Sequence, residues 1–321
     1  MAAELVDLYN DLDPERLRVT RPSKFLFLCG GAVATGDNAK PQNLRDYIYR
    51  VRRLRSPYHI VLAEKATQLY RDTDYDDLIS FEEDIARIAA LVLVIAESAG
   101  SLAELGAFAS NETILKALRV MIKEKHESDE SFIRYGPVER VKKAKWVKKV
   151  KREHLGVYPW RDHANGRLVV SSIEPHYTEI CNFINDHMES IDDSMLARNL
   201  SKETRLFYIV YWIIFLCLAV KPATLSDYVH SILPDTSNID IRNKIYCMEL
   251  AGWIKRVSYS GQDYFYVLYD TDPFRYSFRQ EVNNRDPIRR KLSVTLALRK
   301  KESIPRYITR VATEGRKVAA I

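Results

Sequence analysis

The 321-residue sequence contains little cysteine, and its cysteines are spread far apart. The four, Cys29, Cys181, Cys217 and Cys247, share no short spacing with one another or with histidine. Structural zinc sites and small disulfide-linked domains need such spacings, so we expect neither class and no metal ion. Free thiols are typical of a reducing compartment, and we expect a cytoplasmic protein.

Long hydrophobic runs are also missing. The longest apolar stretch, LFYIVYWIIFLCLAV at residues 206–220, is shorter than the roughly 20 residues that a membrane helix needs. Lys202, Arg205 and Lys221 flank it closely. The first residues, MAAELVDLYNDLDPERLRV, lack the apolar centre of a signal peptide. We therefore expect a buried helix at 206–220 and no membrane partner.

The sequence also lacks the glycine motifs of nucleotide-binding proteins and has only a small net charge. The 11 glycines form neither GxGxxG nor a P-loop, so hydride transfer and NTP hydrolysis are disfavoured. The formal net charge is only +6, from 49 basic and 43 acidic residues, and does not by itself predict a nucleic-acid partner. A 46% apolar composition is enough to supply cores for two domains.

Short apolar runs alternate with helical patterns in the first half of the chain. Each run has the length of a strand buried on both faces, and the stretches between them repeat apolar residues at three and four positions. This alternation predicts an α/β fold, a doubly wound parallel sheet. The expected strands are 24–29, 58–63, 91–96 and 118–123, with helices at 44–54 and 75–90, a fifth strand at 167–173 and a closing helix at 176–191.

The pattern changes after about residue 193 to three helices and a hairpin. The helices are expected at 201–220, 223–232 and 237–252, the last capped by Ser237 or Asn238, and the hairpin turns at Ser260–Gly261. This order is typical of a winged helix, which binds nucleic acid or docks proteins. The predicted domains are an N-terminal helical extension (1–23), an α/β domain (24–192), a winged-helix domain (193–275) and a basic C-terminal tail (276–321).

Basic residues concentrate in residues 138–153, in the predicted third helix and hairpin, and in the tail. Each group is either a solvated surface or a strip that binds phosphates. The candidate nucleic-acid-binding residues are Lys142, Lys143, Lys145, Arg242, Lys244, Lys255, Arg256, Arg289, Arg290 and Lys291.

The segment IAESAGSLAELGAF, residues 95–108, follows the third predicted strand and begins a helix. Ser101 and Glu104 fit a capping box, which would be a purely structural role. Ligands of parallel sheets, however, bind outside the carboxyl ends of the strands, where this turn lies. A catalytic role for Glu104 and a cap are therefore both open.

Other polar and small residues end the neighbouring strands. Gly30 and Gly31 follow the first strand and would let a phosphate or ribose approach backbone amides. Glu64 and Glu97 end the second and third strands, so we expect three carboxylates at one edge, including Glu104. A glutamate in a helix's first turn is held anionic by the helix dipole, which suits stabilisation of a sugar cation.

Three motifs together resemble a known family. FLCGG at 27–31, ESAGSLAELGAF at 97–108 and SFIRYGPV at 131–138 are similar to retron effector proteins that join a nucleoside 2-deoxyribosyltransferase-like domain to a DNA-binding domain. The resemblance covers about residues 24–141. It implies that Glu104 is catalytic and cleaves an N-glycosidic bond, with NAD as substrate and no cofactor. It also implies an anti-phage system in which a reverse transcriptase and its multicopy single-stranded DNA restrain the effector.

The chemistry modestly favours NAD, because nicotinamide leaves as a neutral pyridine and needs no general acid. No histidine is evident in the sheet-edge motifs to protonate a purine. Glu64 and Glu97 stand where the metabolic enzymes of the resembled fold commonly have aspartate, which leaves base recognition open. Ser101 and Tyr135 complete the predicted substrate-binding set, Tyr135 either stacking on a base or anchoring its loop.

Two alternatives remain beside the retron effector. One is a nucleoside or nucleotide glycosidase, or deoxyribosyltransferase, of purine metabolism. The other is a DNA-binding regulator whose α/β domain only senses a nucleotide. The sequence leaves the oligomeric state open, including a homo-oligomer or a higher assembly.

Overall fold

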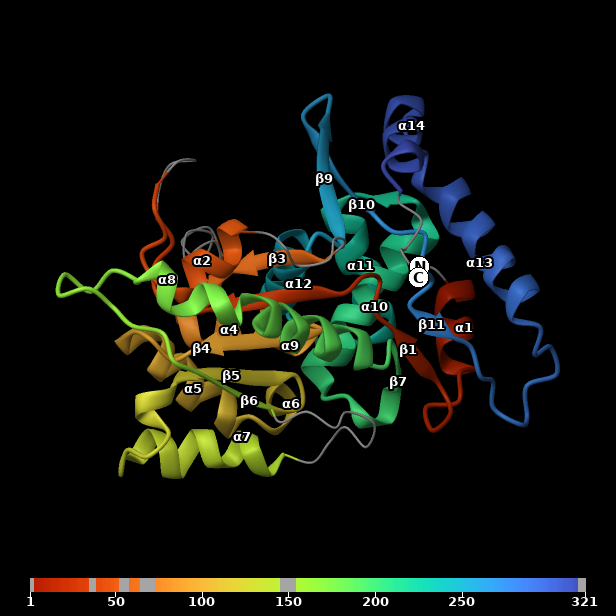
Figure 1. Ribbon diagram of the computed structural model, residues 1–321. Coiled ribbons are helices and arrows are strands. Elements are labelled where there is room, and N and C mark those ends of the chain that lie inside the picture. The colour runs from red at the N-terminus through yellow and green to blue at the C-terminus, as the bar shows by residue number, and fades with distance from the viewer. Residues whose placement is uncertain (1–2, 35–38, 52–57, 64–72, 145–153, 317–321) are drawn as a thin grey trace. The chain divides into compact units, whose positions relative to one another are not determined.

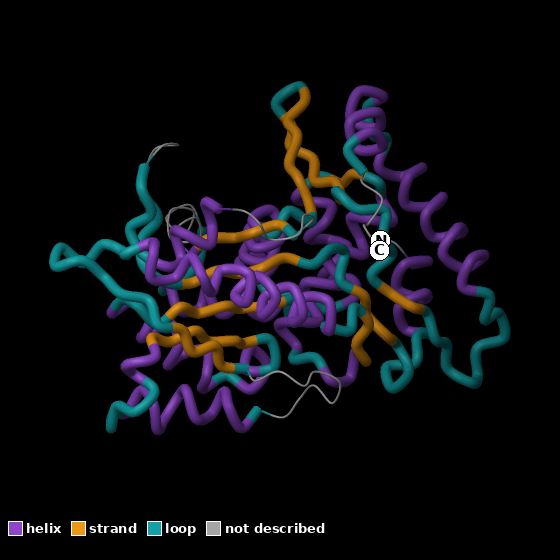
Figure 2. The backbone as a smooth tube through the Cα atoms, viewed as in Figure 1, coloured by secondary structure: helices purple, strands orange, loops and turns teal. Residues whose placement is uncertain are grey.

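The computed structural model describes residues 3–34, 39–51, 58–63, 73–144 and 154–316. The chain forms two compact units. Residues 24–71 and 76–191 form one, here the sheet unit, and residues 1–23, 72–75 and 192–321 form the other, here the helical unit. Figure 1 labels their helices and strands, and Figure 2 shows the backbone by secondary structure.

The centre of the sheet unit is a five-stranded sheet in which every neighbouring pair is parallel. Its order is β3-β2-β4-β5-β6, so the first strand in the chain, β2, lies between the second and third. The strands are β2 (Phe25–Cys29), β3 (His59–Leu62), β4 (Leu91–Ile95), β5 (Leu118–Lys123) and β6 (Leu155–Tyr158). The first four confirm the strands predicted from the apolar runs.

The fifth strand differs from the prediction. The sheet position beside β5 is filled by LGVY at 155–158, with Val120 opposite Leu155. In the predicted segment 167–173, Leu168 makes only an isolated bridge to Asp162, and the residues from Val170 onward form a helical turn. Both segments are short apolar runs of similar length, so the pattern alone could not choose between them.

Helices cover both faces of the sheet. On one face, Leu26 and Leu28 of β2 share a buried core with α2 and α9. On the other, the ring centres of Phe27 in β2 and Phe108 in α5 are 6.2 Å apart. The helices are α2 (Leu44–Val51), α4 (Leu78–Ile88), α5 (Ala99–Ser110), α6 (Glu112–Leu115), α7 (Glu139–Lys143), α8 (Val170–Ile173) and α9 (Tyr177–Ser190), with short turns η1 (Glu124–His126), η2 (Arg134–Val138) and η3 (Glu174–His176). The predicted α/β parallel fold is confirmed.

The helical unit joins residues from both ends of the chain. Strand β1 pairs antiparallel with β11 and β7, and β10 pairs antiparallel with β8 and β9. Its elements are α1 (Ala3–Asn10), β1 (Arg18–Thr20), β7 (Ser194–Leu196), η4 (Ala197–Asn199), α10 (Lys202–Cys217), β8 (Ala219–Val220), α11 (Pro222–Ile232), α12 (Asn238–Leu250), β9 (Ile254–Tyr259), β10 (Gln262–Val267), β11 (Phe274–Arg275), α13 (Pro287–Glu302) and α14 (Arg306–Glu314).

Helix α10 forms the core of the helical unit, as the apolar run at 206–220 predicts. Trp212 and Tyr211 are fully buried, and the Tyr211 hydroxyl donates to the Tyr269 carbonyl at 2.9 Å. None of the described helices is long and apolar enough to cross a membrane. All four cysteines are buried, and none of them forms a disulfide within the described part of the chain.

The predicted order of three helices and a hairpin is present as α10, α11, α12 and β9–β10. Ser237 caps α12 through its side chain, which accepts from the Asp240 amide. Ser260 and Gly261 both have positive φ, of 51° and 73°, as a two-residue hairpin turn requires. The identity of these elements as a winged helix stays a prediction. The segment expected to be a basic tail folds into α13 and α14.

Candidate active site at the carboxyl edge of the sheet

The candidate site lies where β2 and β4 end side by side. The chain leaves β2 toward β3 on one side, whereas β4 and the later strands lie on the other side. Such a switch point opens a crevice at the carboxyl edge of a parallel sheet, and it is the usual ligand site of this architecture. Gly30 and Gly31 follow β2, and Ala96 and Glu97 follow β4.

Glu97 ties the end of β4 to the start of α2. Its Oε1 accepts the backbone N–H of Gly31 at 3.0 Å and of Arg45 at 3.1 Å, and its Oε2 accepts that of Leu44 at 2.9 Å. Burial raises the pKa of Glu97, while these three amides and the Arg45 charge act in the opposite direction. A predicted substrate-binding carboxylate is therefore engaged by the protein's own backbone.

The two glycines are required by this packing. A Cβ on Gly30 would meet the Arg45 side chain at 2.8 Å, and one on Gly31 would meet the Asn43 amide nitrogen at 2.5 Å. Arg45 in turn donates from Nη1 to the Gly31 carbonyl at 3.0 Å. The glycines were expected to leave backbone amides open to a phosphate or ribose, but the Gly31 amide donates to Glu97 instead.

Helix α5 begins one turn earlier than predicted. Ser98, not Ser101, is its N-cap, and Ser101 is the third helical residue and the partner in a capping box. The Ser101 hydroxyl donates to the Ser98 carbonyl at 2.9 Å and accepts the Ser98 amide at 3.0 Å. The predicted box of Ser101 and Glu104 is thus wrong, because two serine hydroxyls complete the cap first.

Glu104 consequently lies in the second turn of α5, where the helix dipole no longer holds a carboxylate anionic. It lies one turn before Phe108, and side chains four apart share a helix face. Since Phe108 contacts Phe27 of β2, Glu104 lies on the β2 side of α5, toward the carboxyl end of the sheet. The residue is only partly exposed, and the Oε2 atom of its carboxylate is buried.

A small cavity of about 140 Å³ lies on the other flank of α5. Its apolar wall includes Ala96 after β4, Leu102 of α5 and Ile122 of β5, and its polar side carries a hydrogen-bonded His126–Asp129 pair. Sequence reasoning found no histidine at this edge. The missed signal is the polar run EKHESDE, residues 124–130, directly after the strand at 118–123, because residues that follow a parallel strand lie at the ligand edge. The remaining lining residues are Ser131, Ile133, Arg134 and Val138.

The other predicted residues of the sheet unit are more scattered. Tyr135 is 58% exposed in η2, with the Arg134 guanidinium 5.0 Å from its ring centre, and it does not line the small cavity. Glu64 and Lys145 lie outside the described residues. Lys142 and Lys143 are exposed on α7. No group of His, Cys, Asp and Glu in the described part of the chain could hold a metal ion.

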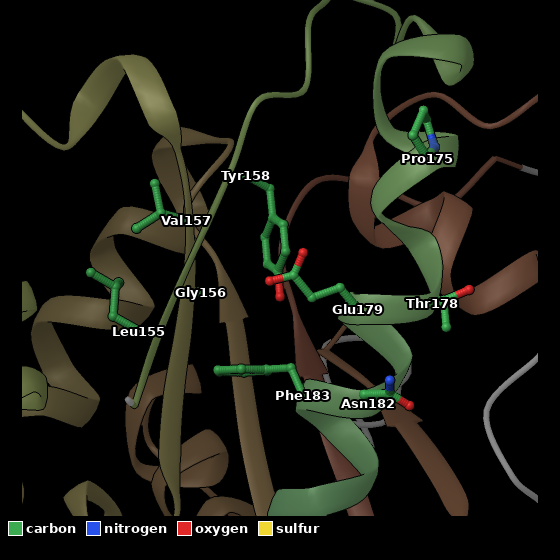
Figure 3. Close-up of a pocket in the computed structure, with 9 residues that line it drawn as sticks. All are labelled: Leu155, Gly156, Val157, Tyr158, Pro175, Thr178, Glu179, Asn182 and Phe183. Carbon is green, nitrogen blue, oxygen red and sulfur yellow. The ribbon is translucent and has the colours of Figure 1, made fainter. Parts of the chain in front are cut away.

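A larger cavity of about 600 Å³ lies between the edge strand β6 and helix α9. Figure 3 shows the Glu179 carboxylate and the Tyr158 ring facing each other in it. No residue predicted from the sequence to bind substrate lines this cavity, so its size does not make it the site that the motifs indicate.

The predicted nucleic-acid residues of the helical unit have unequal surroundings. Lys244 is only 5% exposed, with its ammonium 5.0 Å from the Phe207 ring centre, so it is not part of an exposed basic surface as expected. Arg242 is paired with Asp74 at 2.6 Å. Lys255 and Arg289 are exposed. The remaining ion pairs are Arg256 with Glu249 and Asp263, Arg289 with Asp286, Arg290 with Asp11 and Lys291 with Asp272.

Comparisons with known proteins agree with the motifs. Two curated Escherichia coli proteins are similar to this chain: "Retron Ec73 putative ribosyltransferase/DNA-binding protein", 32% identical over 122 residues, and the protein of the same description from retron Ec86, 33% identical over 119. Each alignment covers 37% of this chain, and 38% and 37% of those relatives. The chain thus matches less than two fifths of the length of either. A family of known proteins matches over residues 41–256, two thirds of the chain, and by this match the chain belongs to the STM3845 retron effector protein family.

Proposed function

We propose that the sheet unit hydrolyses the N-glycosidic bond of NAD and that Glu104 is its catalytic carboxylate. The observation that carries this is the place of Glu104, on the β2 side of α5 at the switch point of the sheet. The relatives named as ribosyltransferases support chemistry at a sugar carbon. Family membership supports a role as a retron defence effector, restrained by a reverse transcriptase and its multicopy single-stranded DNA.

The reaction needs only a few groups from the protein. As the bond from the sugar C1′ to the pyridinium nitrogen breaks, its electron pair neutralises the nicotinamide, and a cation develops on the sugar. The Glu104 carboxylate stabilises that cation directly or bonds to C1′. Water then adds at C1′ and releases a proton, so that ADP-ribose and nicotinamide are the products. Glu97 does not react in this scheme, but it holds together β2, α2 and β4, the elements around the site.

The test is release of nicotinamide by wild-type protein and by Glu104→Gln. The two should be compared with and without the reverse transcriptase and its DNA, because a restrained effector would be inactive in their presence. Loss of a carboxylate that stabilises a sugar cation should lower the rate at least about a hundredfold. Glu174→Gln, at an exposed glutamate of η3, is the matched control. Equal rates for Glu104→Gln and wild type would refute the assignment.

A second candidate is a nucleoside or nucleotide glycosidase, and the His126–Asp129 pair favours it. Release of a purine is helped by a general acid, and a histidine oriented by a carboxylate is a common one. A panel of nucleosides and nucleotides separates the two candidates. Turnover of these with none of NAD, and its loss in His126→Asn, would select the second. Ligand binding without any turnover would instead support a nucleotide-sensing regulator.

For the helical unit, we propose a winged helix that binds nucleic acid. The order α10, α11, α12 and the β9–β10 hairpin supports it. The printed names of the two relatives also include DNA binding. A retention assay with labelled DNA, performed on the full chain, tests this independently of the glycosidase reaction.

A further inference from the structure

Two exposed tyrosines stack at the tip of the hairpin. Tyr259 is the last residue of β9, and Tyr307 is the second residue of α14. Their ring centres are 5.4 Å apart and the ring planes differ by 25°. Tyr259 is 41% exposed and Tyr307 is 44% exposed, although large aromatic side chains are usually covered.

The fold holds this aromatic pair in place from both sides. Val257, two residues before Tyr259 and so on the same face of β9, packs against a small core that includes Ile308 and Ala312 of α14. Ile308 directly follows Tyr307 and is fully buried. The turn at Ser260–Gly261 fixes the end of β9. Figure 1 shows α14 and the hairpin at the same end of the helical unit.

Exposed cations lie on the same two elements as the aromatic pair, β9 and α14. Arg306 and Arg310 are exposed on α14, and the Arg310 guanidinium lies 5.9 Å from the Tyr307 ring centre. Lys255 shares its face of β9 with Tyr259 and is also exposed. Among the described residues, no carboxylate lies within ion-pair distance of Arg306, Arg310 or Lys255. These three charges are therefore available to phosphates.

Helix α12, which in a winged helix would enter the major groove, offers fewer cations to phosphates. Of its two cations, Arg242 is paired with Asp74 and Lys244 is buried. Asp240 is exposed in its first turn. A helix whose one exposed cation is already paired, and which carries an exposed carboxylate, is less suited to the backbone contacts that position a protein on a duplex.

We propose that Tyr259 and Tyr307 form a stacking platform for unpaired nucleobases, with Arg306, Arg310 and Lys255 binding the adjoining phosphates. This rests on the proposed nucleic-acid role of the helical unit and names its ligand as single-stranded. Bases expose their flat faces only when unpaired, and combinations of aromatic rings with a basic groove are how proteins bind single strands without sequence preference. Duplex bases, which stack on each other, would leave the aromatic pair unused.

The test measures binding of the full chain to a fluorescein-labelled oligothymidylate and to the same strand paired with oligodeoxyadenylate, by fluorescence anisotropy. The wild type should prefer the single strand. The double variant Tyr259→Leu/Tyr307→Leu keeps apolar packing but lacks aromatic faces, and it should bind the single strand roughly 5- to 150-fold more weakly. The duplex affinity should change much less. Tyr259→Phe/Tyr307→Phe keeps the rings and should bind as wild type does.

The contribution of the cations is measured by the salt dependence of binding. Arg310→Gln should reduce the slope of log affinity against log salt by somewhat under one unit for a single strand, whereas the leucine variant should leave that slope unchanged. A preference of wild type for the duplex, no binding to either probe, or unchanged single-strand affinity of a folded leucine variant would overturn the proposal. Nicotinamide release by the same variants reports on the sheet unit, so failure here is distinguishable from failure of the glycosidase assignment. If the leucine variant unfolds, the phenylalanine variant and the salt slope of Arg310→Gln still decide.

Discussion

The Glu97 carboxylate accepts the backbone N–H of Gly31 at 3.0 Å, and so it joins the ends of β2 and β4 across the switch point of the sheet. The same carboxylate accepts two amides at the start of α2. A position where related architectures bind an anionic ligand at a helix N-terminus is thus occupied by a side chain of the protein itself. Any ligand at this edge must approach beside Glu97 and not in its place.

Glu97→Gln should therefore destabilise the sheet unit. The substitution keeps the shape but turns one acceptor oxygen into an NH₂ group facing backbone N–H donors, and an unsatisfied buried donor costs about 1–3 kcal/mol. Chemical denaturation followed by circular dichroism measures the effect. Glu174→Gln, at an exposed site, should change the free energy of unfolding by less than about 0.5 kcal/mol. Equal stability of Glu97→Gln and wild type would show that these hydrogen bonds contribute nothing net.

The start of α5 gives a second prediction. Ser98→Ala removes the side chain that accepts the Ser101 amide at 3.1 Å, and should cost about 1 kcal/mol of stability. Ser101→Ala removes the hydroxyl that accepts two amides, from Glu97 and Ser98, and should cost at least as much. Thermal unfolding of both variants checks this. Ser110→Ala, at the exposed end of the helix, is the control. A greater loss from Ser110→Ala than from either cap residue would contradict the observed helix start.

These two features show how far the sequence was predictive. The strands at 25–29 and 91–95 follow from continuous apolar runs, because a run of only about five residues is too short for a buried helix and is typical of a strand buried on both faces. The first residue of α5 could not be predicted from the sequence. Ser98 and Ser101 each precede a polar residue by three positions, so either serine could form a capping box. The role of Glu97 depends on amides that are 52 to 66 positions away in the chain, and no local pattern encodes such contacts.

Lys244 illustrates a signal that was present but not used. It lies three residues after the buried Ile241 and four before the buried Met248, so the helical repeat alone would put it on the covered face. Counting charges alone places Lys244 on the surface, because lysine side chains are rarely buried. The apolar stem of lysine packs like a hydrocarbon, which is how the structure accommodates it.

Lys244 and Lys255 should consequently respond in opposite ways to substitution. Lys244→Ala removes a packed stem and a contact with the Phe207 ring, and should destabilise the helical unit by about 1–3 kcal/mol. Lys255→Ala should leave stability nearly unchanged but weaken binding to a single-stranded oligonucleotide. Chemical denaturation gives the stability of each variant, and fluorescence anisotropy gives the affinity of each variant for the oligonucleotide. A loss of affinity in a fully folded Lys244→Ala protein would mean that Lys244 reaches the ligand.

The stability of the sheet unit should fall in mild acid because of His154. Burial, and then the nearby charge of Arg119, lowers the pKa of His154 from its ordinary value of 6.5 to about 4. Below about pH 6.5 the unfolded chain binds a proton that the folded chain does not bind, so the contribution to stability present at neutral pH is lost as the pH falls toward 4. Because His154 is half-buried, we expect the loss to be about 1–2 kcal/mol.

The measurement is the free energy of unfolding near neutral pH and near pH 5 for wild type and His154→Leu. The leucine variant cannot take up the proton in the unfolded state, so its stability should fall less in acid than that of wild type. His163→Leu removes an exposed histidine and should follow the wild-type pH dependence. Since both variants lose one histidine, a difference between them isolates the buried site. Identical pH dependence in wild type and His154→Leu would show that His154 has the same pKa in the folded and unfolded states.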